Sequence, residues 1–175
     1  LNTALPHIMR ELNINENTSQ WLITGFMLVN GVMIPLTAYL MDKVKTRPLY
    51  LGAMGTFLIG SIVAAIAPNF GVLMFARVIQ AVGAGILMPL MQFTLFTLFS
   101  KEHRGFAMGL AGLVIQFAPA IGPTFTGLII DNASWRVPFI VIVGIALVTF
   151  IFGFVSISSY NTTKETKLDK KSVIY

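Results

Sequence analysis

Residues 73–85 read LMFARVIQAVGAG, a hydrophobic run that carries one arginine, Arg77, near its start. Residues 118–127 read APAIGPTFTG and place Pro119 and Pro123 among small side chains. Both belong to long apolar runs that fill positions 70–130, and the charged link Ser100–Arg104 separates these runs. An ionised side chain in a membrane span is costly, and a proline in a span leaves backbone carbonyls that need other partners. The stretch therefore favours a transport-type helix bundle over a passive membrane anchor.

The composition is that of a membrane protein. Of the 175 residues, 55% are hydrophobic and 11% are charged, and the mean hydropathy is +0.79. Soluble domains carry about 25% charged residues, so we interpret the chain as an integral membrane protein in contact with the lipid bilayer. The net charge of +5 is compatible with nucleic-acid binding. Basic cytoplasmic loops explain it better, and we expect no nucleic-acid partner.

Residue types that build catalytic and metal sites are scarce. The chain has no Cys and two His, which excludes disulfides and thiolate metal sites. All seven acidic residues fall in predicted loops, at span rims or in the tail. We therefore predict no metal, no cofactor and no enzymatic activity.

The first twelve residues, LNTALPHIMREL, are too short and too polar for a complete span, which needs about 20 apolar residues. They also lack the basic start and apolar centre of a signal peptide. We interpret them as the exit end of a helix whose earlier part is missing, and the chain as a fragment of a longer protein.

Five later segments are long and apolar enough to be complete spans. They cover residues of about 21–41, 48–67, 70–99, 105–130 and 135–158. The polar segment Asn13–Gln20 is predicted to be a loop in which Thr18 or Ser19 caps the next helix. Residues 1–158 are thus predicted to form one transmembrane domain, and residues 159–175 a basic tail or linker.

The distribution of Lys and Arg predicts the orientation in the plasma membrane. With loops on alternating sides, one side collects nine basic residues: Lys43, Lys45, Arg47, Lys101, Arg104, Lys164, Lys167, Lys170 and Lys171. The other side has Arg10 and Arg136. By the positive-inside rule, the loops at 42–47 and 100–104 and the tail are cytoplasmic. The segments at 13–20, 68–69 and 131–134 are then outside.

Polar side chains are unevenly spread over the spans. The spans from Pro48 and Trp135 carry only Thr or Ser in their interiors, whereas the other three hold Asn30, Arg77, Gln80, Gln92 and Gln116. Polar spans face protein or water and apolar spans face lipid. We therefore expect the three polar spans, at about 21–41, 70–99 and 105–130, to line the interior of the bundle. Asn30 and Gln116 are candidate substrate contacts, with plain interhelical hydrogen bonding as the open alternative.

Two patterns near the N-terminus match motifs of one transporter family. Asn2–Ile8 is similar to the end of a first-helix motif that closes in A-L-P-x-I. Residues 38–47 are similar to a loop motif G-x-L-A-D-R-x-G-R-K. They keep its acid as Asp42 and its base as Lys43 and end in Arg47, while Ala38 and Lys45 replace its glycines.

Two further patterns follow in the order that the family requires. Residues 73–83 match the fourth-helix motif L-x-x-x-R-x-x-Q-G-x-G at Leu73, Arg77, Gln80 and Gly83. Gly109, Gly122, Pro123 and Gly127 match the antiporter motif of the fifth helix, with Pro119 beside them and with Ala118 and Thr126 in two of the motif's glycine positions. With four motifs in register, the chain resembles the N-terminal half of a major facilitator superfamily transporter. The similar branch is that of the fourteen-span drug:proton antiporters, the multidrug- and lincomycin-resistance-like efflux pumps.

The resemblance implies an all-α integral membrane fold. It would be a six-helix half-bundle of two three-helix repeats, with the first helix truncated and five complete spans. The missing C-terminal half of the transporter would be its partner. The implied activity is export of a hydrophobic small molecule in exchange for protons by alternating access.

The resemblance also assigns roles to residues. Arg77 and Gln80 would take part in proton coupling with a carboxylate that the family places just before Leu1. Asp42, Lys43 and Arg47 would belong to a cytoplasmic gate. The glycines and prolines of residues 109–127 would contact the other half. The alternative function is a non-transporting membrane scaffold or receptor bundle, or an inert truncated product.

Overall fold

The computed structural model describes residues 2–132 and 134–157, and these are helical apart from short links. A 3-10 turn at Asn2–Ala4 leads into the helices α1 (Leu5–Leu12), α2 (Glu16–Lys43), α3 (Thr46–Ala65), α4 (Phe70–Leu98), α5 (Lys101–Asn132) and α6 (Val137–Ser156). Among the described residues there is no strand. The fold class predicted from the sequence is thus confirmed: an all-α protein with five helices, α2 to α6, long and apolar enough to cross a membrane.

Asparagine side chains set the starts of α2 and α4. The Oδ1 atom of Asn15 accepts from the Thr18 amide at 2.8 Å, and that of Asn69 accepts from the Val72 amide at 3.0 Å. Each bond satisfies one of the amides that a helix leaves free at its N-terminus. The prediction that Thr18 or Ser19 caps α2 is therefore wrong, because α2 begins at Glu16 and the cap is Asn15.

The links are shorter than predicted, because helices continue into the charged segments. Asp42 and Lys43 form the last turn of α2, so the predicted loop at 42–47 shrinks to Val44 and Lys45. The predicted loop at 100–104 is also wrong, since α5 already begins at Lys101. Charges of the right sign suit the helix ends: Glu102 lies in the first turn of α5 and Lys43 in the last turn of α2.

The other limits differ from the predicted spans by up to a few residues. The predicted second span, 48–67, corresponds to α3, and the predicted fifth span, 135–158, corresponds to α6. α5 extends through Asp131 and Asn132, which were predicted as part of a loop. The predicted tail, 159–175, lies outside the described residues.

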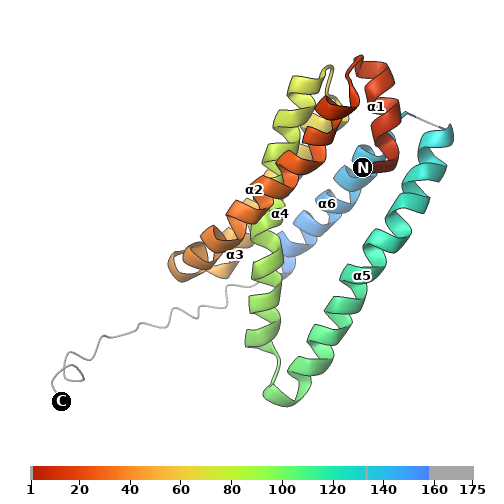
Figure 1. The fold of residues 1–175 in the computed structure, drawn as a ribbon. Coiled ribbons are helices and arrows are strands. Elements are labelled where there is room, and N and C mark those ends of the chain that lie inside the picture. Colours follow the sequence, from red (N-terminus) through yellow and green to blue (C-terminus); the bar gives the residue numbers. More distant parts are fainter. Residues whose placement is uncertain (1, 133, 158–175) are drawn as a thin grey trace, which may run out of the picture.

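Helix α4 is the centre of the described bundle. It packs against α2 on one side and α3 on another, and α3 also packs against α6. Figure 1 shows α5 as a separate rod that joins α4 at one end and runs apart from α2 and α4 along most of its length. Burial within the chain therefore does not follow polar content: α3, expected on the outside, is as buried as α4, whereas α5, expected inside, is the least buried.

Two apolar clusters hold the helices together. The first lies at the end of the bundle that contains α1, and its largest buried side chains are Ile8, Leu22, Leu73 and Trp135. The second lies nearer the opposite end, where α2 meets α3, and comprises Met33, Leu49, Ala53, Ile86 and Leu90. We call these two ends the α1 end and the α2–α3 end.

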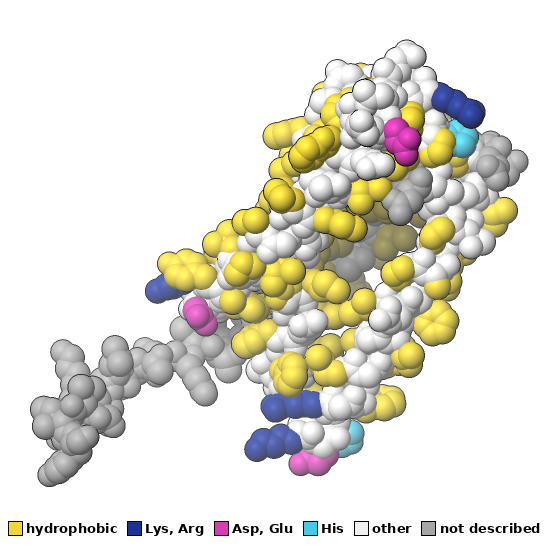
Figure 2. All heavy atoms as spheres, in the orientation of Figure 1, with side chains coloured by type: hydrophobic (Ala, Val, Ile, Leu, Met, Phe, Trp, Pro, Cys, Tyr) yellow, Lys and Arg dark blue, Asp and Glu magenta, His cyan; other side chains and the backbone are white. Residues whose placement is uncertain are grey.

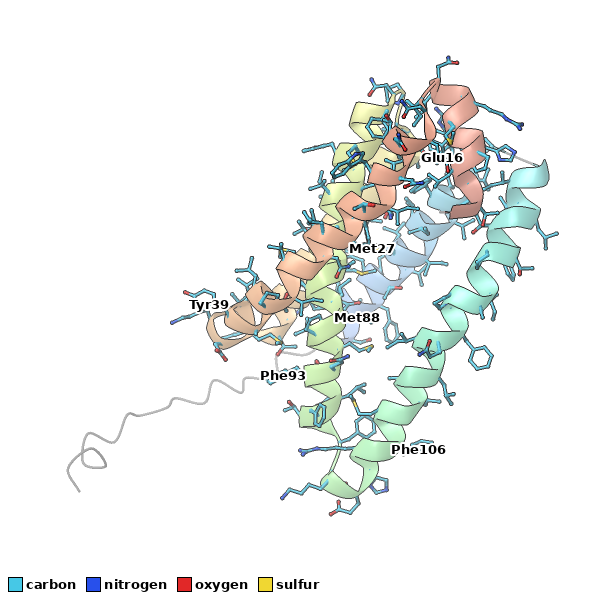
Figure 3. All side chains as sticks on the ribbon, in the orientation of Figure 1. Glu16, Met27, Tyr39, Met88, Phe93 and Phe106 are labelled. Atoms are coloured by element: carbon cyan, nitrogen blue, oxygen red, sulfur yellow. The ribbon has the colours of Figure 1, made fainter. Side chains whose placement is uncertain are left out.

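The surface between the two ends is apolar. Figure 2 shows hydrophobic side chains spread over the visible face, with the Lys, Arg, Asp and Glu side chains gathered toward the two ends. The exposed apolar side chains include Met27 and Tyr39 of α2, Met88 and Phe93 of α4, and Phe106 of α5 (Figure 3). Helices that are apolar on their outer surfaces suit a lipid environment. The chain is a multi-pass membrane protein.

Candidate functional site

Arg77 is held between α4 and α2 by two hydrogen bonds. Its Nε atom donates to the carbonyl oxygen of Leu22 at 3.3 Å, and its Nη1 atom donates to Oε1 of Gln80 at 2.9 Å. The guanidinium also lies over the ring of Phe26, 4.1 Å from the ring centre. A cation over an aromatic face is attracted by the ring quadrupole. The charge inside this span is thus partly buried and is directed toward α2.

Gln80 extends the arrangement from α4 to α3. Its side chain is 1% exposed, and its Nε2 atom donates to Oγ of Ser61 at 2.9 Å. Ser61 in turn donates to the carbonyl oxygen of Phe57 at 2.8 Å. A chain of hydrogen bonds therefore connects α2, α4 and α3 through Arg77, Gln80 and Ser61. We call these three residues the Arg77 network.

The structure brings together the two residues that the sequence placed in one site, Arg77 and Gln80, which stand three positions apart on one helix face. Sequence reasoning missed the other contributors: Ser61, Phe26 and the Leu22 carbonyl. Ser61 had a weak signal, as a hydroxyl side chain in an otherwise apolar span. The Leu22 carbonyl had none, because every residue has one.

Close helix packing supports the Arg77 network. A Cβ atom on Gly60 would lie 2.7 Å from the Gln80 amide nitrogen, and one on Gly83 would lie 2.5 Å from the Ala53 carbonyl oxygen. Both neighbours are backbone atoms, which cannot move aside without shifting a helix. Gly60 on α3 and Gly83 on α4 therefore let these two helices approach each other closely.

The residues assigned to a cytoplasmic gate do not meet one another. Asp42 is exposed and forms no hydrogen bond or ion pair with the described residues. The Lys43 ammonium lies 5.9 Å from the ring centre of Tyr39. Arg47 donates from Nη2 to the carbonyl oxygen of Phe154 at 3.2 Å, in the last turn of α6. A cation at that position suits the negative end of the α6 dipole.

The antiporter-motif residues lie along α5 and have few neighbours in the described chain. A Cβ atom on Gly109 or Gly122 would meet nothing within 4 Å, and one on Gly127 would meet only the Thr3 methyl carbon at 3.6 Å. Ala118, Pro119 and Pro123 are exposed, and both prolines lie inside α5 without ending it. The motif is therefore an open face of α5.

The candidate substrate contacts are also apart from the Arg77 network. Asn30 is half-buried on α2, and Gln116 is exposed on α5. Neither side chain forms a hydrogen bond with the described residues, and the structure does not bring the two together in one site.

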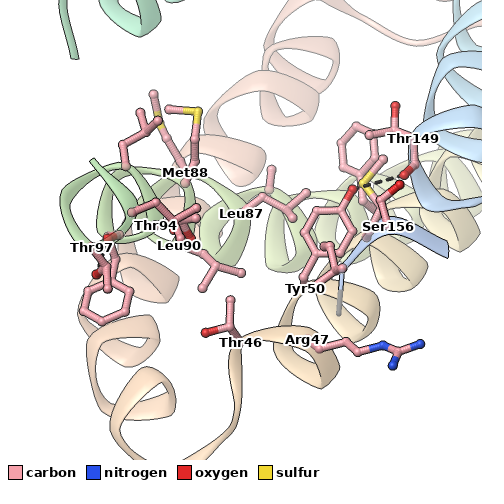
Figure 4. Close-up of a pocket in the computed structure, with 18 residues that line it drawn as sticks. Thr46, Arg47, Tyr50, Leu87, Met88, Leu90, Thr94, Thr97, Thr149 and Ser156 are labelled. Atoms are coloured by element: carbon pink, nitrogen blue, oxygen red, sulfur yellow. Dashed lines mark hydrogen bonds between the residues drawn. The ribbon is translucent and has the colours of Figure 1, made fainter. Parts of the chain in front are cut away.

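A cavity of about 770 Å³ lies beside α4 in the half of the bundle near the α2–α3 end (Figure 4). Its lining is mainly apolar and includes Met54, Phe57, Leu87, Met88 and Met91. Its polar groups come mainly from the helix ends and include Thr46, Arg47, Thr97 and Ser156. Apolar pockets with a few polar groups are typical sites for small molecules. Sequence reasoning missed this cavity, because its lining side chains are ordinary span residues from three helices.

No group of three or more His, Asp or Glu side chains that could hold a metal ion occurs among the described residues. The hydrogen-bonding and packing features found above are those of a membrane helix bundle that holds one partly buried cation, Arg77, well inside a described span.

Comparison with known proteins identifies the relatives of this chain. The uncharacterized MFS-type transporter YcnB of Bacillus subtilis is 51% identical over 172 residues, which is 98% of this chain and 36% of that protein. The lincomycin resistance protein LmrB of the same organism is 41% identical, over 99% of this chain and 36% of its own length. The probable multidrug resistance protein EmrY of Escherichia coli is 33% identical, over 84% of this chain and 29% of its own length.

The chain thus spans about a third of the length of the curated relatives that it matches. The sequence profile of the Major Facilitator Superfamily matches residues 1–173, almost the whole chain. Together with the bundle of five apolar helices and the partly buried arginine of α4, this match shows that the chain belongs to the Major Facilitator Superfamily.

Proposed function

We propose that this chain is the N-terminal helical half of a secondary active transporter that exports hydrophobic small molecules in exchange for protons by alternating access. The names of two relatives support the substrate class, since one is a lincomycin resistance protein and another a probable multidrug resistance protein. The short match to each relative supports a longer functional unit, with a C-terminal half as the partner of this chain.

The observation that carries the proposal is the incomplete hydrogen bonding of the Arg77 guanidinium among the described residues. Its Nε and Nη1 atoms hold the Leu22 carbonyl and Gln80, while its Nη2 atom donates to none of the described residues. A guanidinium with free donors inside a span is ready to bind a carboxylate. The family resemblance places such a carboxylate in the helix segment just before Leu1.

A carboxylate that binds Arg77 would couple helix movement to proton exchange. An adjacent cation keeps the pKa of an acid low, and withdrawal of the cation raises that pKa, so the acid would take up or release a proton as the helices move. Arg77 itself stays charged and so cannot carry the proton. Gln80, fixed by Ser61, would hold the guanidinium in position.

The test is gradient-driven efflux by the longer protein in proteoliposomes, at matched protein levels and beside a proton-independent substrate-binding assay. Arg77→Ala is expected to abolish the response to the proton gradient while substrate binding persists. Arg77→Lys should also fail, because an ammonium lacks the planar fork that serves two acceptors and an acid at once. Arg104→Ala is the matched control, since Arg104 is a half-buried arginine near the start of α5 whose guanidinium donates to the Phe99 carbonyl and lies 5.9 Å from the centre of the Phe96 ring. Normal gradient-driven efflux by Arg77→Ala would reject the coupling role.

We also propose that the α2–α3 end and the start of α5 face the cytoplasm and the α1 end faces outside. The support is the excess of basic residues at positions 43–47 and 101–104. Because the chain has no native Cys, Glu16→Cys and Lys45→Cys can be tested in intact cells. An impermeant thiol reagent is expected to label the first and spare the second, and the opposite pattern would reject this orientation.

A further inference from the structure

Three chain segments far apart in sequence meet at Glu11, at the α1 end of the bundle. Nε1 of Trp135 donates to one carboxylate oxygen of Glu11 at 2.6 Å, and Nη1 of Arg136 donates to the other. Nη2 of Arg136 donates to the carbonyl oxygen of Ala67 at 3.1 Å. The contacts join α1, the link between α3 and α4, and the residues just before α6.

Trp135 is the buried member of this group, whereas the Arg136 and Glu11 side chains are 29% and 46% exposed. Trp135 is 1% exposed, and its ring meets Phe139 edge-on with the ring centres 6.0 Å apart. Ile8 of α1 and Ala67 belong to the same buried cluster. A buried indole N–H needs an acceptor, and the Glu11 carboxylate supplies it.

Arg136 is suited to its place by its shape as well as its charge. Its guanidinium lies 4.4 Å from the centre of the Trp135 ring and serves two acceptors, Glu11 and the Ala67 carbonyl. A lysine ammonium cannot reproduce this planar arrangement. Glu11 and Arg136 form the one ion pair that occurs among the described residues.

We propose that Glu11, Trp135 and Arg136 form a clasp that holds the end of α1, the α3–α4 link and the start of α6 as one rigid unit, with Glu11 as the residue that positions α1. The clasp matters because α1 packs on the bundle through one face, with Ile8 buried and Arg10 and Glu11 exposed. The proposal does not depend on transport, so it stands or fails apart from the proposed function.

The clasp predicts a defined response to acid. The hydrogen bond from Arg136 lowers the pKa of the Glu11 carboxyl, burial opposes this, and the Trp135 bond and the Arg136 charge lower it further. A carboxyl with a lowered pKa in the folded state stabilises the fold above its unfolded pKa, and this stabilisation is lost as the pH falls through the folded pKa. The clasp therefore stays closed at neutral pH and opens only below the ordinary carboxyl range.

Other charged groups near Glu11 do not provide this response. His7 and Arg10 share the short helix α1, and Glu16 begins α2; all three are exposed and no hydrogen bond or ion pair connects them to Glu11. Asp131 precedes the clasp in sequence, and its side chain lies outside those described.

Trp135 provides the readout, because the chain has only two Trp residues. A Trp21→Phe version of the chain in detergent leaves Trp135 as the one emitter, and its emission is measured as the pH is lowered. We expect an emission change with a midpoint below the usual carboxyl range. Arg136→Gln should raise that midpoint by about 1 to 3 pH units, the effect of removing a close opposite charge. Glu11→Gln should remove the transition.

Control variants separate the clasp from general effects. Arg10→Gln removes an exposed cation one position from Glu11 and should leave the midpoint unchanged. Arg136→Lys keeps the positive charge but loses the planar guanidinium that serves two acceptors. Its midpoint should therefore fall between those of the parent and Arg136→Gln. A nitroxide label on Arg10→Cys should gain mobility when Glu11→Gln is added, whereas a label on Lys45→Cys at the opposite end should not. A Trp135 emission that does not titrate, or a midpoint that Arg136→Gln leaves unchanged, would overturn the proposal.

Discussion

Helices α4 and α5 carry the same kinds of residue and make opposite use of them. On α4, Gly83 packs against the backbone of α3, and Gln80 bonds both Arg77 and Ser61. On α5, a Cβ atom on Gly122 would meet nothing within 4 Å, and Gln116 makes no hydrogen bond with the described residues. Small and polar residues in a span thus indicate a contact, but they do not tell whether the contact is made within this chain or is open to a partner.

The largest expected effect is the loss of stability when a glycine of α4 is enlarged, compared with the same change on α5. Gly83→Leu places a branched side chain where even a Cβ would be 2.5 Å from the Ala53 oxygen and 2.7 Å from the Phe57 nitrogen. We expect α3 and α4 to separate and the chain to lose cooperative thermal unfolding in detergent. Gly83→Ala should cost about 1 to 3 kcal/mol or more, as overpacked sites do.

Gly122→Leu is the matched variant on α5. It should unfold at the temperature of the parent, because a Cβ atom there would meet no described residue of another element within 4 Å. Equal losses of stability for Gly83→Leu and Gly122→Leu would show that α5 packs in this chain as tightly as α4 does.

The second prediction asks whether the open face of α5 has a partner in the longer protein. If the other half packs against Gly122, then Gly122→Leu should abolish transport although the protein still reaches the membrane, because the new side chain holds the halves apart. Gly144→Leu on α6 is the control: a Cβ there also meets nothing within 4 Å, and it lies outside the antiporter motif. Transport at the parent rate by Gly122→Leu would reduce the motif to a packing feature.

The third prediction compares two glutamines. Gln80→Leu removes one of the two acceptors of Arg77 and the donor to Ser61 at a 1% exposed position. Hydrogen bonds between membrane helices contribute about 0.6 to 2 kcal/mol each, so we expect a measurable fall in unfolding free energy. Gln116→Leu should change it little, since that side chain is exposed. Thermal unfolding of both variants beside the parent checks the difference, and a larger loss for Gln116→Leu would contradict it.

The sequence predicted features that depend on local periodicity. The spans follow from hydrophobic length, and the contact of Arg77 with Gln80 follows from a spacing of three on a helix. The fold class and the family were predicted correctly for the same reason, since the motif spacings are properties of single helices. Helix ends were predicted less well, because charged residues such as Lys101 and Asp42 are compatible with both a loop and a helix end.

Contacts between distant segments could not be predicted. Glu11 and Trp135 stand 124 positions apart, and Trp135 could be expected to lie at a membrane interface on composition alone. Its burial against α1 depends on how α1, α3 and α6 converge. The same holds for Arg47, whose basic charge predicted a cytoplasmic side but not its bond to the Phe154 carbonyl at the end of α6.

The smallest expected effect concerns Asp42, at the end of α2 opposite the clasp. A negative charge in the last turn of a helix opposes the helix dipole, at a cost of about 0.3 to 1 kcal/mol. Since Asp42 has no partner among the described residues, its acid does not stabilise this half, and Asp42→Asn should leave the chain as stable or slightly more stable.

In the longer protein we propose that the carboxylate of Asp42 contacts a base and a helix N-terminus of the other half when the transporter faces outward. Loss of such a contact, about 0.3 to 1 kcal/mol and up to about 2 when partly buried, shifts a rocking equilibrium severalfold. Asp42→Asn is therefore expected to raise the inward-facing population, as measured by the accessibility of cysteines placed on the two sides, while Glu102→Gln, which neutralises an exposed acid in the first turn of α5, should not. If Asp42→Asn leaves both accessibility and transport unchanged, the acid has no gating role, and the α2–α3 end is no more specialised than the start of α5.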